Sequence, residues 1–284
     1  FTSCQSNNIS DPEIARLIFQ AESAFRGGYY NAALSIADSA ISLNPKLADI
    51  HFLKGRVLTK LSRFAEAEDA YSQVISIDNK YQGAWFNIGT NNLRQNKVPQ
   101  AIYSYFNEMN EHPSAQTMVQ IGKAYSDLGK ADSAHLSYEK AIQINSSFAP
   151  AYMRLSHLNK DAGEINEAIN HAKKGIELEP ENIDYKYFMG SLLLLNGQPN
   201  LSIPYFELVV NEKPWHYWAH HNLGQSLYRV GEKRKSDFYI QRAKELQKGV
   251  QEVENWRNLA NMNPDQFMLW INLGNSLNSM GRTM

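Results

Sequence analysis

The chain has 284 residues, of which 43% are hydrophobic and 20% are charged, and its formal net charge is −1. This length suits either one large core or an array of small units, and the composition is ordinary for a folded protein. The balanced charge, with no strongly basic half, argues against a nucleic-acid partner. The longest apolar stretch, YFMGSLLLLNG at 187–197, is far too short to span a bilayer.

The N-terminal segment, residues 1–13, is predicted to be a tail or tether. It holds the only cysteine, Cys4, so an internal disulfide and a cysteine-based zinc site are excluded. Because the first residue is Phe, we expect the natural start to lie upstream or to have been removed. FTSC at 1–4 resembles a bacterial lipobox, although a lipobox normally has Leu where Phe1 stands. The alternative is an ordinary tail in which Cys4 occurs by chance.

From residue 14 onward, small residues recur with a period of about 34 residues. Segments such as WFNIGTNNL (85–93) and HHNLGQSL (220–227) superimpose on one another. The small residues in register are Ala21, Gly55, Gly89, Gly122, Ser156, Gly190, Gly224 and Gly274. A second set follows twelve residues later, namely Ala33, Ala67, Ala101, Ala134, Ala168, Ser202 and Ser236.

This pattern predicts two amphipathic helices of about a dozen residues in each unit, because apolar residues recur at helical spacing. The small residues would lie where the two helices cross, since a larger side chain would push the backbones apart. Gly or Asn is predicted in the turn between the helices, at Gly28, Asn96, Gly129, Gly163, Gly197 and Gly231. One such pair cannot bury its apolar face alone, so the pairs are expected to stack.

The pattern resembles the tetratricopeptide repeat family, as the third unit shows with Trp85, Ile88, Gly89, Ala101, Tyr105 and Pro113. The resemblance covers residues 14 to 284. It implies an all-α, right-handed α-solenoid of tandem helix-turn-helix repeats, with a concave groove lined by the first helix of each repeat. We expect seven repeats in 14–248, a helical insertion at 249–266 and the first helix of a truncated eighth repeat at 267–284.

Two features at the C-terminal end depart from the repeat. In the insertion, the second helix of repeat seven is expected either to be extended or to be followed by another helix. The sequence ends where the second helix of repeat eight should begin, which would leave an apolar face uncovered. We expect the natural chain to continue beyond Met284; the alternative is that another molecule covers this face.

The stretch PWHYWAHHNLG at 214–224 contains His216 and His220, whose four-residue spacing could hold a metal on one helical face. The repeat instead places His220 at an aromatic packing position, as with Trp85, and His216 in the turn before the helix. No third ligand is suitably spaced, so no metal site is predicted. Because HExxH, P-loop, GxSxG and dinucleotide motifs are lacking, we predict no cofactor, no catalytic residues and no enzyme activity.

The family resemblance implies which residues face the groove and contact a protein or peptide partner. They are Phe52, Phe86, Asn87, Lys123, Arg154, Tyr187, Trp218, His221, Asn222, Gln225, Tyr228, Arg229 and Asn272. Asn87, Asn222 and Asn272 resemble fragments of the asparagine ladder in the repeat arm of O-linked N-acetylglucosamine transferase, where amides hold a peptide backbone. The alternative is that Asn is simply common at exposed helical sites.

The expected ligand is a mixed, partly hydrophobic segment, because Phe52, Phe86, Tyr187, Phe188 and Leu194 would form apolar patches in the groove. In some family members a carboxylate clamp holds an acidic C-terminus. That clamp needs Lys and Asn in one unit, Asn in the next, and Lys and Arg in a third. No three consecutive units supply this set, so binding by that mechanism is not expected.

We therefore predict a non-enzymatic scaffold that binds a protein or extended peptide in its groove. If Cys4 is lipidated, the protein would help to assemble or organise a bacterial cell-envelope complex, tethered in the periplasm or at the outer membrane; otherwise it would be cytoplasmic. One alternative is a substrate-selecting or regulatory arm of an enzyme whose catalytic domain lies beyond residue 284. Another is a structural subunit that self-associates through the open C-terminal repeat.

Overall fold

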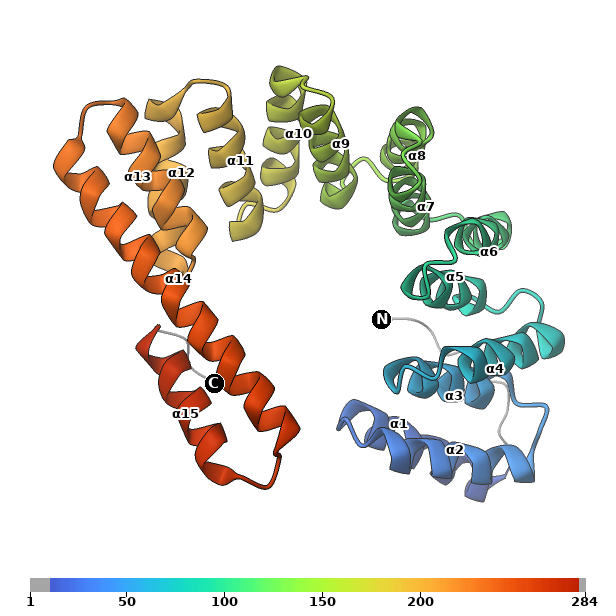
Figure 1. Cartoon of the computed structure of the whole chain (residues 1–284). Helices are drawn as coiled ribbons and strands as arrows, with labels where there is room; N and C mark the ends of the chain where they lie inside the picture. The colour runs from blue at the N-terminus through green and yellow to red at the C-terminus, as the bar shows by residue number, and fades with distance from the viewer. Residues whose placement is uncertain (1–10, 281–284) are drawn as a thin grey trace. The chain divides into compact units, whose positions relative to one another are not determined.

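The computed structural model describes residues 11–280, and within this range it contains fifteen α-helices packed in consecutive pairs (Figure 1). The predicted fold class, an all-α solenoid of tandem helix pairs, is confirmed. The odd-numbered helices are here called first helices and the even-numbered ones second helices. Contacts divide the chain into two compact units, with unit 1 ending at Ser146 and unit 2 beginning at Ser147.

Unit 1 consists of four helix pairs. Its helices are α1 (Pro12–Arg26), α2 (Tyr30–Leu43), α3 (Ala48–Lys60), α4 (Phe64–Ile77), α5 (Ala84–Arg94), α6 (Val98–Glu111), α7 (Ala115–Asp127) and α8 (Ala131–Ile144). Unit 2 contains α9 (Ala149–Asp161), α10 (Ile165–Leu178), α11 (Ile183–Leu195), α12 (Pro199–Glu212), α13 (Tyr217–Arg229), α14 (Lys233–Met262) and α15 (Phe267–Ser279). Among these residues, no helix combines the length and apolar character needed to cross a membrane.

The turn inside each pair depends on one residue with left-handed backbone. All six Gly and Asn residues predicted for these turns have positive φ, for example 78° at Gly28 and 59° at Asn96. The pair α3–α4 uses Ser62 instead, with φ of 59°. A serine gives no sequence signal for this conformation, because L-residues with a side chain other than Asn or Asp rarely adopt it.

At five of the helix crossings a glycine faces a large side chain, and there the two helices pack tightly. A Cβ added to Gly89 would lie 2.7 Å from Cε1 of Tyr105, and one added to Gly122 would collide with the ring of Tyr138. In α9–α10, Ser156 occupies the crossing and the equivalent partner is only Ala172. The facing residues are Ala21 and Ala37, Gly55 and Tyr71, Gly89 and Tyr105, Gly122 and Tyr138, Ser156 and Ala172, Gly190 and Phe206, and Gly224 and Ile240.

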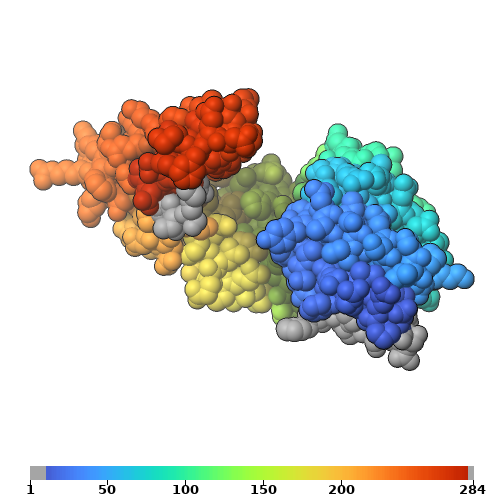
Figure 2. Space-filling model, turned by 90° about the horizontal axis from the view of Figure 1, so that it is seen from below, coloured from blue at the N-terminus to red at the C-terminus, as the bar shows by residue number. Residues whose placement is uncertain are grey.

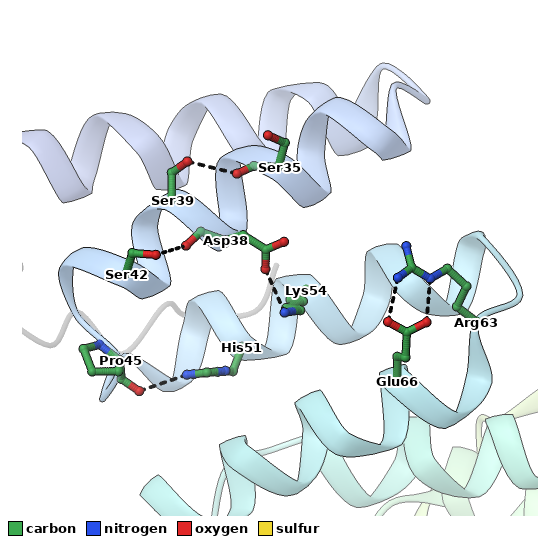
Figure 3. Close-up of polar contacts among 9 residues, drawn as sticks. All are labelled: Ser35, Asp38, Ser39, Ser42, Pro45, His51, Lys54, Arg63 and Glu66. Carbon is green, nitrogen blue, oxygen red and sulfur yellow. Dashed lines mark hydrogen bonds and ion pairs between the residues drawn. The ribbon is translucent and has the colours of Figure 1, made fainter.

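The loops between pairs are fastened to the helix that follows. His51 donates from Nε2 to the carbonyl oxygen of Pro45 at 2.9 Å (Figure 3). His220 makes the same contact with Pro214 at 2.9 Å, and Nε1 of Trp270 donates to Pro264 O at 3.1 Å. The residue at the predicted aromatic packing position therefore also donates a hydrogen bond to the preceding loop, and both His and Trp have a ring N–H that can do so.

The C-terminal end of unit 2 is built on one long helix. Of the two alternatives for the insertion, the structure shows the first: α14 continues for 30 residues and pairs with α13 and then with α15 (Figure 1). Figure 2 shows the residues of this end of unit 2, coloured orange to red, packed together. Val253, Leu273 and Met280 form the small core of the α14–α15 hairpin, and Trp215 from the loop before α13 packs against it. This contact accounts for one tryptophan of the aromatic cluster at 214–224.

Candidate partner-binding surface

The predicted groove residues lie on first helices in both units, and each unit has its own first-helix face. In unit 1 they are Phe52 on α3, Phe86 and Asn87 on α5, and Lys123 on α7. In unit 2 they are Arg154 on α9, Tyr187 on α11, Trp218, His221, Asn222, Gln225, Tyr228 and Arg229 on α13, and Asn272 on α15.

Helix α13 presents an exposed stripe of aromatic and polar side chains. Trp218 is 50% exposed and Tyr228 is 66% exposed, whereas His220, Leu223 and Leu227 are buried. The exposed residues follow the helical period, so they share one face. An aromatic surface beside hydrogen-bonding groups is suited to holding a peptide, because aromatic side chains give a large contact area at small entropic cost.

The side chains along this stripe are already ordered by contacts with one another. The rings of Trp218 and His221 meet edge to face at 5.8 Å, and Gln225 donates from Nε2 to Nε2 of His221 at 2.9 Å. Arg229 donates from Nη1 to Leu194 O, a terminal carbonyl of α11, at 3.0 Å. Gln225, Tyr228 and Arg229 also line an open depression of about 390 Å³ against the start of α14.

A second cluster in unit 2 joins α9 to α11. His157 stacks on Phe188 with ring centroids 3.9 Å apart, and Nζ of Lys160 lies 5.9 Å from the Phe188 centroid. Burial lowers the pKa of His157, and the positive charges of Lys160 and Arg154 lower it further. The imidazole is therefore neutral near pH 7 and lies in a locally positive field.

The asparagines of the predicted ladder are engaged within the protein. Asn222 donates from Nδ2 to the hydroxyl of Tyr187 at 3.2 Å, and Asn87 donates to Gly83 O at 2.7 Å in its own first turn. Asn272 on α15 is half-buried. Burial is also the main reason that the pKa of Tyr187 is raised. In Asn87 and Asn222 the side-chain nitrogen already donates one hydrogen bond within the protein, whereas the side-chain oxygen can still accept one from a ligand.

The apolar patches differ from the prediction at one residue. Leu194 was expected to line the groove, but it is buried among Phe206, Val209 and Leu223, because the face of α11 that carries it turns toward the next pair. The neighbouring Leu195, which the sequence analysis did not select, is 61% exposed. Phe52 and Phe86 are half-buried, and their rings pack against Tyr71 and Tyr105, respectively.

The histidine pair at 216 and 220 has structural contacts. His216 caps α13, where Nδ1 accepts from the backbone N–H of Ala219 at 3.0 Å, and His220 is tied to Pro214. Burial lowers the pKa of both imidazoles. Within residues 11–280, no group of three His, Cys, Asp or Glu side chains is arranged to hold a metal ion. The predicted lipidation site, Cys4, lies outside the described residues.

Comparison with known proteins points to one family. Models described as tetratricopeptide repeat match residues 20–82, 115–148 and 149–182. The small glutamine-rich tetratricopeptide repeat-containing protein 2 of Mycosarcoma maydis is 37% identical over 59 residues, which are 21% of this chain and 17% of that protein. The chain spans less than a fifth of the length of the curated relatives it matches.

Solved structures share the fold over longer stretches. A tetratricopeptide repeat protein from Parabacteroides merdae aligns with a TM-score of 0.62 and 15% identity, over 94% of this chain and all of that one (100%). YrrB, described as a protein of this type with an unusual peptide-binding site, aligns with a TM-score of 0.50 and 16% identity, over 65% of this chain and 96% of that one. At these identities the likeness concerns the fold alone.

Proposed function

We propose that the chain, which matches tetratricopeptide repeat models at residues 20–82, 115–148 and 149–182, is a non-enzymatic scaffold that binds an extended segment of a partner protein on its first helices. Proteins of this family generally bind proteins or peptides. The observation that carries the proposal is the stripe on α13, where Trp218 and Tyr228 stay exposed beside Gln225. The peptide-binding site named for YrrB supports it as an analogy.

The ordering of this stripe also supports the proposal. Side chains that are held in place before binding lose less conformational entropy when a partner arrives. The Trp218–His221–Gln225 contacts and the bond from Arg229 to Leu194 provide such order. The open depression beside Tyr228 could receive a side chain of the bound segment.

Replacing Trp218 and Tyr228 together by Ala is expected to weaken peptide binding by roughly tenfold or more, because exposed aromatic anchors contribute most to such surfaces. Peptides of about 12 residues, which reach roughly 40 Å when extended, would be selected by display on the unaltered protein. The affinity of a selected peptide for each variant would then be measured by fluorescence anisotropy. Tyr103→Ala is the matched control, since Tyr103 is also 66% exposed but lies on the second helix α6.

Equal affinity for the double variant and the wild type would show that this face is not used. Failure to select any peptide would count against the scaffold proposal as a whole. Circular dichroism of each variant separates lost binding from lost structure, because the fold is entirely helical over the described residues.

We further propose that Cys4 is lipidated and that the scaffold helps to organise a bacterial cell-envelope complex. The support is the FTSC motif and the polar QSNNIS stretch that follows it. Intact-mass analysis of the protein from its native source is expected to show a chain beginning at Cys4 with added acyl mass. An unmodified chain that retains Phe1 would contradict the proposed lipid anchor, and the scaffold proposal would then stand without a membrane location.

A further inference from the structure

Charge in unit 1 is separated between first and second helices. The four second helices carry eight acidic residues and one basic one: Asp38, Glu66, Glu68, Asp69, Glu108, Glu111, Asp132 and Glu139, with Lys140. The four first helices carry seven basic residues and four acidic ones: Arg16, Arg26, Lys54, Arg56, Lys60, Arg94 and Lys123, with Glu13, Glu22, Asp49 and Asp127. The near-zero net charge of the chain hides this polarity.

Pairing neutralises some of these basic residues but leaves four of them, on α3, α5 and α7, without an acidic partner among the described residues. Lys54 reaches across to Asp38 on α2 at 2.7 Å, and Arg63 in the α3–α4 turn pairs with Glu66 (Figure 3). Arg26 pairs with Glu22 at 3.0 Å. By contrast, Arg56, Lys60, Arg94 and Lys123 have no ion pair with any residue between 11 and 280.

A polar network joins α3, α4 and α5, and its residues on α3 and α5 lie close in the chain to Arg56 and Arg94. Asn91 donates from Nδ2 to Oγ1 of Thr59 at 2.9 Å, and the Tyr71 hydroxyl lies 3.5 Å from the same oxygen. Burial raises the pKa of Tyr71 to about 12, while the positive charges of Arg56 and Arg94 act against that rise. Thr59 lies one helical turn after Arg56 and Asn91 lies one turn before Arg94, so the bond between Asn91 and Thr59 joins the parts of α3 and α5 that carry the two arginines.

Apolar surface accompanies these charges. The guanidinium carbon of Arg56 lies 4.5 Å from the ring centroid of Phe25, which leaves the donors at the edge of its plane available to a ligand. Phe19, six residues earlier on α1, is 68% exposed. The first-helix face of unit 1 thus combines unpaired cations with aromatic surface.

We propose that the first-helix face of unit 1 binds an acidic internal segment of the partner protein, with Arg56 and Arg94 contacting its Asp or Glu side chains and Phe19 on α1 contacting an apolar side chain to one side of them. This inference rests on the proposed scaffold function and specifies the chemistry of its ligand. Carboxylates are the chosen ligand because guanidinium groups bind them in a two-pronged geometry. No chain end is required, which distinguishes this mode from a clamp for a C-terminal carboxylate.

The first experiment compares three synthetic peptides of about 12 residues that share the same Leu and Phe positions. Their other positions hold Glu and Asp, Gln and Asn, or Lys. With the full chain, the acidic peptide is expected to bind roughly tenfold or more tightly than the neutral one, and its affinity should fall as salt is raised. Equal or tighter binding of the neutral or basic peptide would overturn the proposal.

The second experiment tests whether Arg56 and Arg94 are the residues that contact the acidic side chains. The double variant Arg56→Gln/Arg94→Gln is expected to weaken binding of the acidic peptide by roughly tenfold and to leave the neutral peptide unchanged, because each lost guanidinium removes a charge-assisted contact. Lys140→Gln on α8 is the matched control, since it removes an exposed positive charge from a second helix of the same unit. A loss in the control equal to that in the double variant would overturn the proposal.

Two further measurements keep the outcome clear. Arg94→Gln alone changes an exposed side chain, so it tests the charge even if Arg56→Gln disturbs Phe25. A single-stranded oligonucleotide serves as a competitor, and tighter binding of it to this face would overturn the choice of ligand. If selected peptides bind through Trp218 and Tyr228 but ignore Arg56 and Arg94, only this inference fails; if no peptide binds at all, the scaffold proposal fails as well.

Discussion

Gly122→Ser is expected to lower the free energy of unfolding by about 2 kcal/mol, although Ser is a better helix former than Gly. A Cβ at this position would collide with the ring of Tyr138, which is 3% exposed and has no free space into which to move. To accept it, α7 and α8 must separate, and the contacts on either side of the crossing loosen. Urea denaturation followed by circular dichroism measures the loss.

A double variant provides a matched test, because another helix pair of this chain has Ser and Ala at the positions of Gly122 and Tyr138. Ser156 in α9 occupies the equivalent position, donates from Oγ to Ala168 O, and has Ala172 where α8 has Tyr138. Tyr138→Ala alone should cost about 3 kcal/mol through the cavity it leaves. The double variant Gly122→Ser/Tyr138→Ala should be more stable than the sum of the two single losses predicts. Strict additivity would show that the two residues do not constrain each other.

Glu108→Ala is expected to lower the free energy of unfolding by about 2 to 3 kcal/mol, because it removes a buried cap from another helix. Glu108 lies on α6 and is only 4% exposed. Its Oε1 accepts from the Gly83 N–H at 2.8 Å and its Oε2 from the Phe86 N–H at 3.2 Å. Both N–H groups belong to the start of α5, which has no capping side chain of its own. Their loss would leave two donors unpaired and remove a negative charge favoured at a helix N-terminus.

Glu111→Ala on the same helix provides the control, since that carboxylate is exposed and pairs only with Lys80 at 3.4 Å. Its loss should cost about 0.5 kcal/mol or less. Glu108→Gln keeps one carbonyl acceptor and should fall between the two Ala variants. Hydrogen exchange at Phe86 would report the effect locally, and unchanged protection there in Glu108→Ala would contradict the capping role.

The helix pairs could be predicted because their determinants are local and repeat along the chain. A crossing Gly such as Gly89, a turn residue such as Asn96 and a closing Pro such as Pro113 recur about every 34 residues, so seven copies reinforce one reading. The left-handed turns and the loop contact of His220 follow from these positions. The single helix α14 was one of two alternatives, since residues 249–262 keep helical spacing without a turn signal.

Features that do not follow from the repeated pattern were not predictable. Nothing in the sequence marks Ser62 as left-handed or Glu108 as a cap for a helix that starts 25 residues earlier. Leu194 rather than Leu195 is buried because Leu194 packs against Phe206 and Leu223 of the next helices, and a run of four leucines does not indicate which of them makes that contact. The pairing of Lys54 and the lack of pairing of Arg56, only two residues apart, depend on the position of Asp38 on a neighbouring helix.

Helix α14 has a consequence for how unit 2 comes apart. In an ordinary repeat array each helix pair is a separate structural element, and unfolding can stop at the boundary between two pairs. Here α13 and α15 pack against the same helix, which at 30 residues is roughly 45 Å long. A break between them would have to melt α14 in its middle, at a point where its backbone hydrogen bonds continue without interruption. Helices α13, α14 and α15 are therefore expected to unfold together as one cooperative segment rather than one after the other.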